Sequence, residues 1–127
     1  MKQTLLVGLG GFLGSIARYK LSAFILHHSQ SWRFPISTFA INVLGCLTIG
    51  VLAGFAERRD LFSQDTRLFL FTGLLGGFTT FSAFSYEGVN LLRRGEPSIA
   101  LLYAVLSVVI GFGAVWFAIR VFNPGSH

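Results

Sequence analysis

The stretch F-T-G-L-L-G-G-F-T-T-F-S-A-F-S, residues 71–85, is the most informative part of this 127-residue sequence. It is apolar enough for the interior of a membrane, yet Gly76 and Gly77 stand side by side near its middle, and Thr79 and Thr80 follow closely. Each glycine costs roughly 1 kcal/mol relative to alanine in a helix interior. The pattern therefore predicts an apolar helix that is broken near its middle.

A broken helix frees backbone carbonyl groups at membrane depth, and each of these groups needs a partner. The hydroxyl groups of Thr79 and Thr80 are one set of partners, and a cation such as sodium is another. A continuous helix that uses its glycines as a packing face is the alternative interpretation.

Three phenylalanines, Phe78, Phe81 and Phe84, follow one another at intervals of three residues, which places their rings along one stripe of a helix. A stripe of this kind is, taken alone, more typical of packing or lipid contact. Here hydroxyl-bearing residues alternate with the rings: Thr79, Thr80, Ser82 and Ser85. Because ring edges are electropositive and hydroxyl hydrogens donate hydrogen bonds, the combination can also face an anion.

Four apolar stretches, each near the length of about 20 residues that a membrane helix needs, hold most of the chain: residues 4–26, 35–56, 68–92 and 97–122. Hydrophobic residues make up 53% of the sequence and charged residues 12%, against about 25% charged in soluble proteins. These values exclude a soluble enzyme, a disordered chain and, with Cys46 as the one cysteine, a disulfide-rich secreted module. We expect an all-α membrane protein of four transmembrane helices, a single domain over residues 1–127 with a short tail at 123–127.

The charges are nearly balanced between the two ends of such a bundle. Five basic residues fall on the side of the termini: Lys2, Arg58, Arg59, Arg67 and Arg120. Three fall on the other side (Arg33, Arg93 and Arg94), and Arg18 and Lys20 lean toward it. The positive-inside rule then gives almost no preferred orientation, which favours an antiparallel dual-topology homodimer. The formal net charge of +5 suits a lipid surface, and without a basic stripe of interleaved exposed aromatics it does not indicate nucleic acid.

Small residues recur at the four-residue spacing that lets helix backbones approach closely. The G-x-x-x-G pairs are Gly10 with Gly14, Gly50 with Gly54, and Gly73 with Gly77. Their contacts lie either within one chain or between two chains.

Several polar side chains fall inside the predicted spans. Asn42 offers two amide donors, although intramembrane asparagine often only joins two helices. Further hydroxyl groups come from Thr48, Tyr103 and Ser107. Arg18 is the deepest charge of the first span, and it either has a function or extends to the interface. A set of hydroxyls, one amide and one cation suits a small, strongly hydrated anion.

Taken in order, these motifs resemble the Fluc (CrcB) fluoride-channel family, and the resemblance runs from about Leu5 to Arg120. It is carried by G-G-F-L-G-S-I-A-R-Y at residues 10–19, T-F-A-I-N-V-L-G at 38–45 and G-L-L-G-G-F-T-T-F-S-A-F-S at 73–85. The resemblance implies four-span chains in antiparallel homodimers of the bacterial inner membrane. It also implies two pores per dimer that passively export cytoplasmic fluoride and protect against its toxicity.

The resemblance further implies a role for individual residues. The implied fluoride pore consists of Phe81, Phe84, Asn42, Ser82, Thr80, Tyr103 and Ser107. Arg18 matches a vestibule arginine, and Glu87 matches an acidic position near a pore end. The backbone carbonyls of Gly76 and Thr79 match those that hold a structural sodium ion at the centre of the dimer.

Two other classes of protein fit part of the pattern. A proton-coupled small multidrug exporter also has four spans, but it needs a carboxylate in the first span, where this chain carries Arg18 and Lys20 and no acid. A non-transporting assembly subunit would use the polar groups only to join helices. Residue spacing alone does not separate a fluoride channel from a fluoride–proton antiporter, and only the family resemblance favours the channel.

Overall fold

The computed structural model describes residues 1–125, and all regular structure in that range is helical. The elements are α1 (Lys2–His28), α2 (Ile36–Arg59), α3 (Gln64–Arg67), the π-helical segment η1 (Leu68–Leu75), α4 (Gly76–Phe78), α5 (Phe81–Arg93) and α6 (Pro97–Phe122). The predicted all-α fold is confirmed for these residues. Of the predicted tail, residues 126–127 lie outside the described part of the chain.

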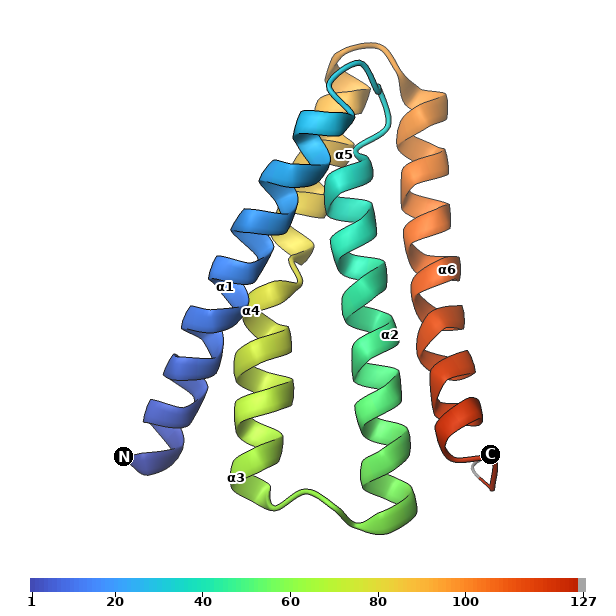
Figure 1. The fold of residues 1–127 in the computed structure, drawn as a ribbon. Helices are drawn as coiled ribbons and strands as arrows, with labels where there is room; N and C mark the ends of the chain where they lie inside the picture. Colours follow the sequence, from blue (N-terminus) through green and yellow to red (C-terminus); the bar gives the residue numbers. More distant parts are fainter. Residues whose placement is uncertain (126–127) are drawn as a thin grey trace.

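The helices run alternately up and down, so the start of α1 and the end of α6 lie at the same end of the molecule (Figure 1). The connection at residues 60–63 is also at this end. The loop at residues 29–35 and the turn at 94–96 lie at the opposite end, which we call the loop end (Figure 1).

Three helical stretches are long and apolar enough to cross a membrane: Ile36–Arg59, Gln64–Arg93 and Pro97–Phe122. The second of these runs from α3 through α5. The helix α1 has 27 residues, but Arg18 and Lys20 lower its apolar character and it is not among the three. The predicted fourth span therefore stays a prediction.

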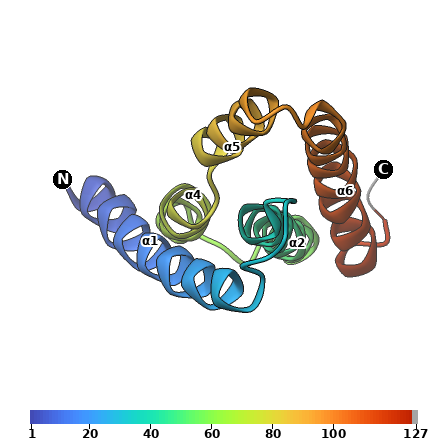
Figure 2. The ribbon, with the colours of Figure 1, turned by 90° about the horizontal axis from the view of Figure 1, so that it is seen from above.

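Glycines let α1 lie directly against η1 and α4, as Figure 2 shows from above. A Cβ atom at Gly10 would lie 2.6 Å from the carbonyl oxygen of Phe69, and one at Gly77 would lie 2.6 Å from that of Gly11. A Cβ atom at Gly14 would meet the carbonyl oxygen of Leu74. These contacts leave no room for a side chain, so the pairs at 10/14 and 73/77 pack within the chain.

The third glycine pair holds α2 against α6. A Cβ atom at Gly50 would lie 2.7 Å from the Cβ of Ala118, and one at Gly54 would lie 3.1 Å from that of Phe122. All three G-x-x-x-G pairs thus serve contacts inside one chain, one of the two alternatives that the sequence left open.

Two residues between α4 and α5 have extended backbone: Thr79 has φ −88° and ψ 160°, and Thr80 has φ −152° and ψ 116°. The adjacent glycines that drew attention to this stretch are themselves helical, since Gly76 has φ −61° and ψ −36° and Gly77 lies in α4. Because Gly77 has no side chain, the neighbouring helix α1 can pack directly against α4 at this point. The π-helical turns of η1, just before these glycines, have no recognisable signal in the sequence.

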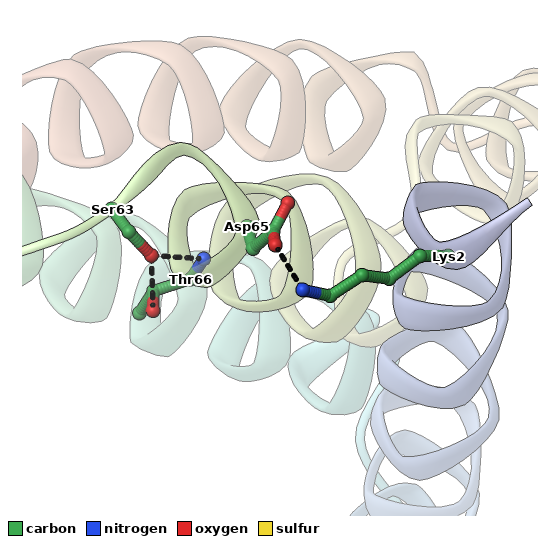
Figure 3. Close-up of polar contacts among 4 residues, drawn as sticks. All are labelled: Lys2, Ser63, Asp65 and Thr66. Carbon is green, nitrogen blue, oxygen red and sulfur yellow. Dashed lines mark hydrogen bonds and ion pairs between the residues drawn. The ribbon is translucent and has the colours of Figure 1, made fainter.

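A small polar cluster joins α1 to α3 at the end of the molecule where the two chain termini lie (Figure 3). The Nζ atom of Lys2 lies 3.0 Å from Oδ2 of Asp65. Ser63 caps α3, because its Oγ accepts a hydrogen bond of 3.2 Å from the amide of Thr66. The Lys2 side chain is 79% exposed, so the ion pair contributes at most about 1 kcal/mol. It orients the start of α1 but does not hold the fold together.

We expect Gly14→Ala to destabilise the protein, because the new methyl group would meet the carbonyl oxygen of Leu74. Such overpacking costs about 1–3 kcal/mol, which should lower the melting temperature of the detergent-solubilised protein measurably. Gly8→Ala is the matched control, since nothing lies within 4 Å of the position that a Cβ atom would take there. Alanine at that exposed helical site should leave the melting temperature unchanged or raise it. Equal melting of the two variants would contradict the close packing of α1.

Candidate functional site

Seven of the predicted site residues line one open groove of about 440 Å³, which we call the central groove. It lies between α2, the junction of α4 with α5, and α6. The seven residues are Asn42, Gly76, Thr79, Thr80, Phe81, Phe84 and Ser107. Residues more than sixty positions apart in the chain thus share one surface.

The Asn42 side chain makes two reciprocal hydrogen bonds with the backbone of Thr80. Its Nδ2 donates to the carbonyl oxygen of Thr80 at 3.1 Å, and its Oδ1 accepts from the amide of Thr80 at 2.9 Å. The side-chain amide of Asn42 therefore pairs with both backbone groups of the extended residue Thr80, as the backbone of a neighbouring β-strand would. The bond to Thr80 uses one of the two hydrogens on Nδ2, which leaves the second hydrogen outside this pair of contacts.

Two backbone carbonyls lose their usual helical partners at this junction. In a continuous helix the amide of Thr80 would bond to the carbonyl of Gly76, and the amide of Ala83 would bond to that of Thr79. Here the amide of Thr80 donates to Asn42, and the amide of Ala83 donates to Oγ1 of Thr80 at 3.2 Å. The carbonyl oxygens of Gly76 and Thr79 are thereby released from α-helical pairing.

The Thr79 side chain turns back to its own helix, where its Oγ1 donates to the carbonyl of Leu75 at 2.9 Å. Its methyl group fills the space that a Cβ atom would occupy at Gly45 of α2. Within residues 1–125, no group of three or more His, Cys, Asp or Glu side chains is placed to hold a metal ion. A cation at this junction would therefore depend on backbone oxygens.

Aromatic rings lead from the central groove into the core. Phe81 is 78% exposed on the groove, and its ring centroid lies 5.7 Å from that of Phe84. The Phe84 ring lies 5.0 Å from that of Tyr103, which is fully buried. The three rings form a row from the exposed face to the interior of the bundle.

The predicted hydroxyls of α6 have contrasting surroundings. Tyr103 Oη donates to Oε1 of Glu87 at 3.4 Å. Ser107 Oγ is buried and has no hydrogen-bond partner among the described residues. A buried hydroxyl without a partner costs about 1–3 kcal/mol, so such groups are rare and often mark a place that a ligand or water completes.

Four predicted site residues lie outside the central groove. Arg18 donates from Nε to the carbonyl of Gly77 at 3.1 Å, on the side of α4 that faces α1. Ser82 is exposed, and its Oγ lies 3.3 Å from Oγ1 of Thr80. Tyr103 belongs to the core, and Glu87 lines a second cleft at the loop end. Their roles in a pore stay predictions.

The groove also has members that were not predicted as site residues, among them Gly45, Cys46, Gly111 and Phe112. Helical spacing could have predicted that two of these residues lie on the groove. Cys46 follows Asn42 by four positions, and Gly111 follows Ser107 by four, so each lies on the same helix face as its partner. The thiol of Cys46 is free.

These features define the class: the chain is a helical membrane protein with a partly polar groove between its helices. The family described as "CrcB-like protein, Camphor Resistance (CrcB)" matches residues 5–119, and the chain belongs to this family. The resemblance inferred from the sequence motifs is thereby confirmed.

Similar chains carry the name "Fluoride-specific ion channel FluC". One from Methylobacillus flagellatus is 53% identical over 116 residues, covering 91% of both chains. One from Rhizobium leguminosarum is 45% identical over 121 residues, covering 95% of this chain and 96% of its own. One from Flavobacterium psychrophilum is 44% identical over 116 residues, covering 91% and 93%. The family is one of channels and not of enzymes.

Replacing Asn42 by leucine should loosen the junction, because both backbone groups of Thr80 would lose their partner. Each unsatisfied buried group costs about 1–3 kcal/mol. We expect a lower melting temperature and faster hydrogen exchange of the Thr80 amide. Thr48→Val is the control, since the Thr48 hydroxyl is exposed and bonds only to its own helix at Leu44. Unchanged exchange at Thr80 in Asn42→Leu would show that this contact does not hold the junction.

Proposed function

We propose that the protein is a passive, fluoride-selective channel that exports cytoplasmic fluoride and so protects the cell from its toxicity. The observation that carries the proposal is the central groove, which gathers an amide, hydroxyls and phenyl rings on one surface. The names of the relatives support the same substrate. We place the protein in the inner membrane of a bacterium, because the relatives named above come from bacteria.

Fluoride holds its water strongly, so a path across a membrane must replace that water with other donors. The second amide hydrogen of Asn42 and the buried hydroxyl of Ser107 are suitable donors on the groove. The ring edges of Phe81 and Phe84 carry positive potential. All of these groups are uncharged, which favours binding that is weak enough for the ion to leave again. The inside-negative potential drives the anion outward with about 2.3 kcal/mol per 100 mV.

We propose that a second, antiparallel copy of the chain closes the groove. Phe81 is 78% exposed, so an anion beside it would face lipid if the chain were alone. A two-fold axis in the membrane plane would create two equivalent pores, one along each groove. The balanced basic residues at the two ends support insertion in both orientations. The rows of exposed apolar side chains on α1 and α6 suit contact with a partner or with lipid.

In this assembly α1 also crosses the membrane, in addition to the three long apolar stretches described above. Its 27 residues extend about 40 Å, more than the apolar thickness of about 30 Å of a bilayer. Arg18 lies within it, and its bond to the carbonyl of Gly77 provides a partner at membrane depth.

We further propose a structural sodium ion at the centre of the dimer, held by the carbonyl oxygens of Gly76 and Thr79. Both oxygens are released from helical pairing, as described above. Unwound backbone carbonyls are suitable ligands for sodium. When bound, the ion would balance the partial negative charge of these oxygens at the junction of the two chains.

Fluoride efflux from proteoliposomes, read with a fluoride electrode, tests the channel. Addition of a potassium ionophore without a proton gradient should release fluoride rapidly while chloride stays inside. Efflux that requires a proton gradient would indicate an antiporter instead. Absence of any ion flux from folded, reconstituted protein would overturn the proposed function.

The double variant Phe81→Ile/Phe84→Ile should slow fluoride efflux about tenfold or more, which corresponds to at least about 1.4 kcal/mol, because both electropositive ring edges are lost. Phe117→Ile is the matched control, since Phe117 is 60% exposed on α6 but does not line the groove. Its efflux should equal that of the unmodified protein. Equal efflux in all three proteins would exclude the ring-edge mechanism.

Sodium should stabilise the protein in detergent relative to potassium at equal ionic strength. At a concentration 100 times its dissociation constant, an ion bound only by the folded state adds about 2.7 kcal/mol. The melting temperature should therefore rise with sodium concentration and reach a plateau. Identical melting curves in sodium and potassium would contradict the sodium site without affecting the fluoride measurement.

A further inference from the structure

A second cleft, of about 550 Å³, lies at the loop end of the bundle. It is formed by the last turns of α1, the loop at 29–35, the start of α2 and the end of α5 (Figure 1). Its polar lining residues are His27, Gln30, Arg33, Glu87, Asn90 and Arg94, together with buried serines. None of these basic or amide groups has a part in the proposed fluoride path.

Two guanidinium groups, those of Arg33 and Arg94, line the cleft. The Arg33 side chain is 76% exposed, and the ion pair that it makes, with Glu96, is long at 3.7 Å. Arg94 donates from Nε to the carbonyl of Asn90 at 3.4 Å. That bond leaves the two terminal nitrogens of Arg94 out of the contact. Terminal guanidinium nitrogens form the paired donors that match the oxygens of a phosphate group.

The remaining polar groups suit an ester of phosphate better than a free phosphate ion. Glu87 contributes one negative charge to the lining, which disfavours a dianion but tolerates a singly charged diester. The side-chain amides of Gln30 and Asn90 can bond to neutral hydroxyls. A phosphodiester that carries a small hydroxylated group fits these requirements.

The apolar surroundings place the cleft at a lipid surface. Trp32, next to Arg33 on the loop, is 57% exposed, and Phe24 and Leu26 on the last turns of α1 are 62% and 54% exposed. Exposed tryptophan and arginine at the end of a membrane helix are typical of the headgroup region. Ala23 and Leu26 continue the cleft lining along α1, on a surface that an acyl chain could follow.

We propose that this cleft binds the headgroup phosphodiester of an anionic phospholipid of the phosphatidylglycerol type. Arg33 and Arg94 bind the phosphate oxygens, and Gln30 and Asn90 bind the headgroup hydroxyls. The acyl chains lie along α1 beside Leu26. Basic pockets between membrane helices bind phospholipid headgroups by the same chemistry. This proposal requires the protein to lie in a bilayer, but it does not depend on fluoride conduction.

Native mass spectrometry of the full-length protein, with phosphatidylglycerol added to the detergent solution, tests the site. The unmodified protein should retain the lipid, whereas Arg33→Gln/Arg94→Gln should bind it about tenfold more weakly through the loss of charge-assisted hydrogen bonds. Undiminished retention in that double variant would overturn the proposal.

Arg93→Gln and Arg94→Gln form a matched pair of single variants. Both remove one charge from adjacent exposed positions, but only Arg94 lines the cleft. Weaker retention in Arg94→Gln alone supports the site, whereas equal loss in both would overturn it in favour of diffuse attraction between charges. The pair keeps the test decisive if the double variant does not fold.

Inorganic phosphate and phosphatidylcholine complete the experiment. Displacement of the lipid by millimolar phosphate would identify a site for free phosphate and overturn the lipid assignment. Retention of phosphatidylcholine as strong as that of phosphatidylglycerol would show that the hydroxylated anionic headgroup is not recognised. That result would overturn the lipid assignment as well. The fluoride efflux of the same variants is measured separately, so a failure of this proposal is distinguishable from a failure of the channel.

Discussion

The pair of hydrogen bonds between Asn42 and Thr80 is the interaction on which the centre of the molecule depends. Two extended residues at membrane depth would leave amide and carbonyl groups unsatisfied, which an apolar surrounding penalises heavily. One amide side chain on α2 satisfies both groups of Thr80. By diverting the amide of Thr80, the same side chain also releases the carbonyl of Gly76. A single residue thus stabilises the junction and exposes a backbone oxygen beside the groove.

Close glycine packing keeps that junction in place. α1 lies against η1 and α4 at distances that exclude side chains, and α2 lies against α6 in the same way. These two contacts set the positions of α4, α2 and α6, which line the central groove. The Thr79 methyl group, seated on Gly45, joins the junction to α2 at one further point. Packing and hydrogen bonding therefore both connect the junction between α4 and α5 to α2, the packing through Thr79 and Gly45 and the hydrogen bonds through Thr80 and Asn42.

The sequence predicted the helical fold, because hydropathy and spacing report on local structure. Of the eleven site residues that the family resemblance implied, seven lie on the central groove. It did not predict that Gly76 and Gly77 stay helical while Thr79 and Thr80 are extended. That outcome depends on Asn42, which is nearly forty positions away, and on the approach of α1. The π-helical turns of η1 had no local signal either. Nor does the sequence show that the Tyr103 ring lies in the core, because burial is decided by how helices pair and not by composition. The role of Tyr103 in a pore stays a prediction.

The row of rings from Phe81 through Phe84 to Tyr103 connects the two concave regions of the molecule. Phe81 and Phe84 line the central groove, and Tyr103 donates a hydrogen bond to Glu87, which lines the cleft at the loop end. Three packed rings and one hydrogen bond therefore form a continuous line of contacts between the two regions. The positions of the two concave regions relative to each other are thus set by contacts between neighbouring side chains.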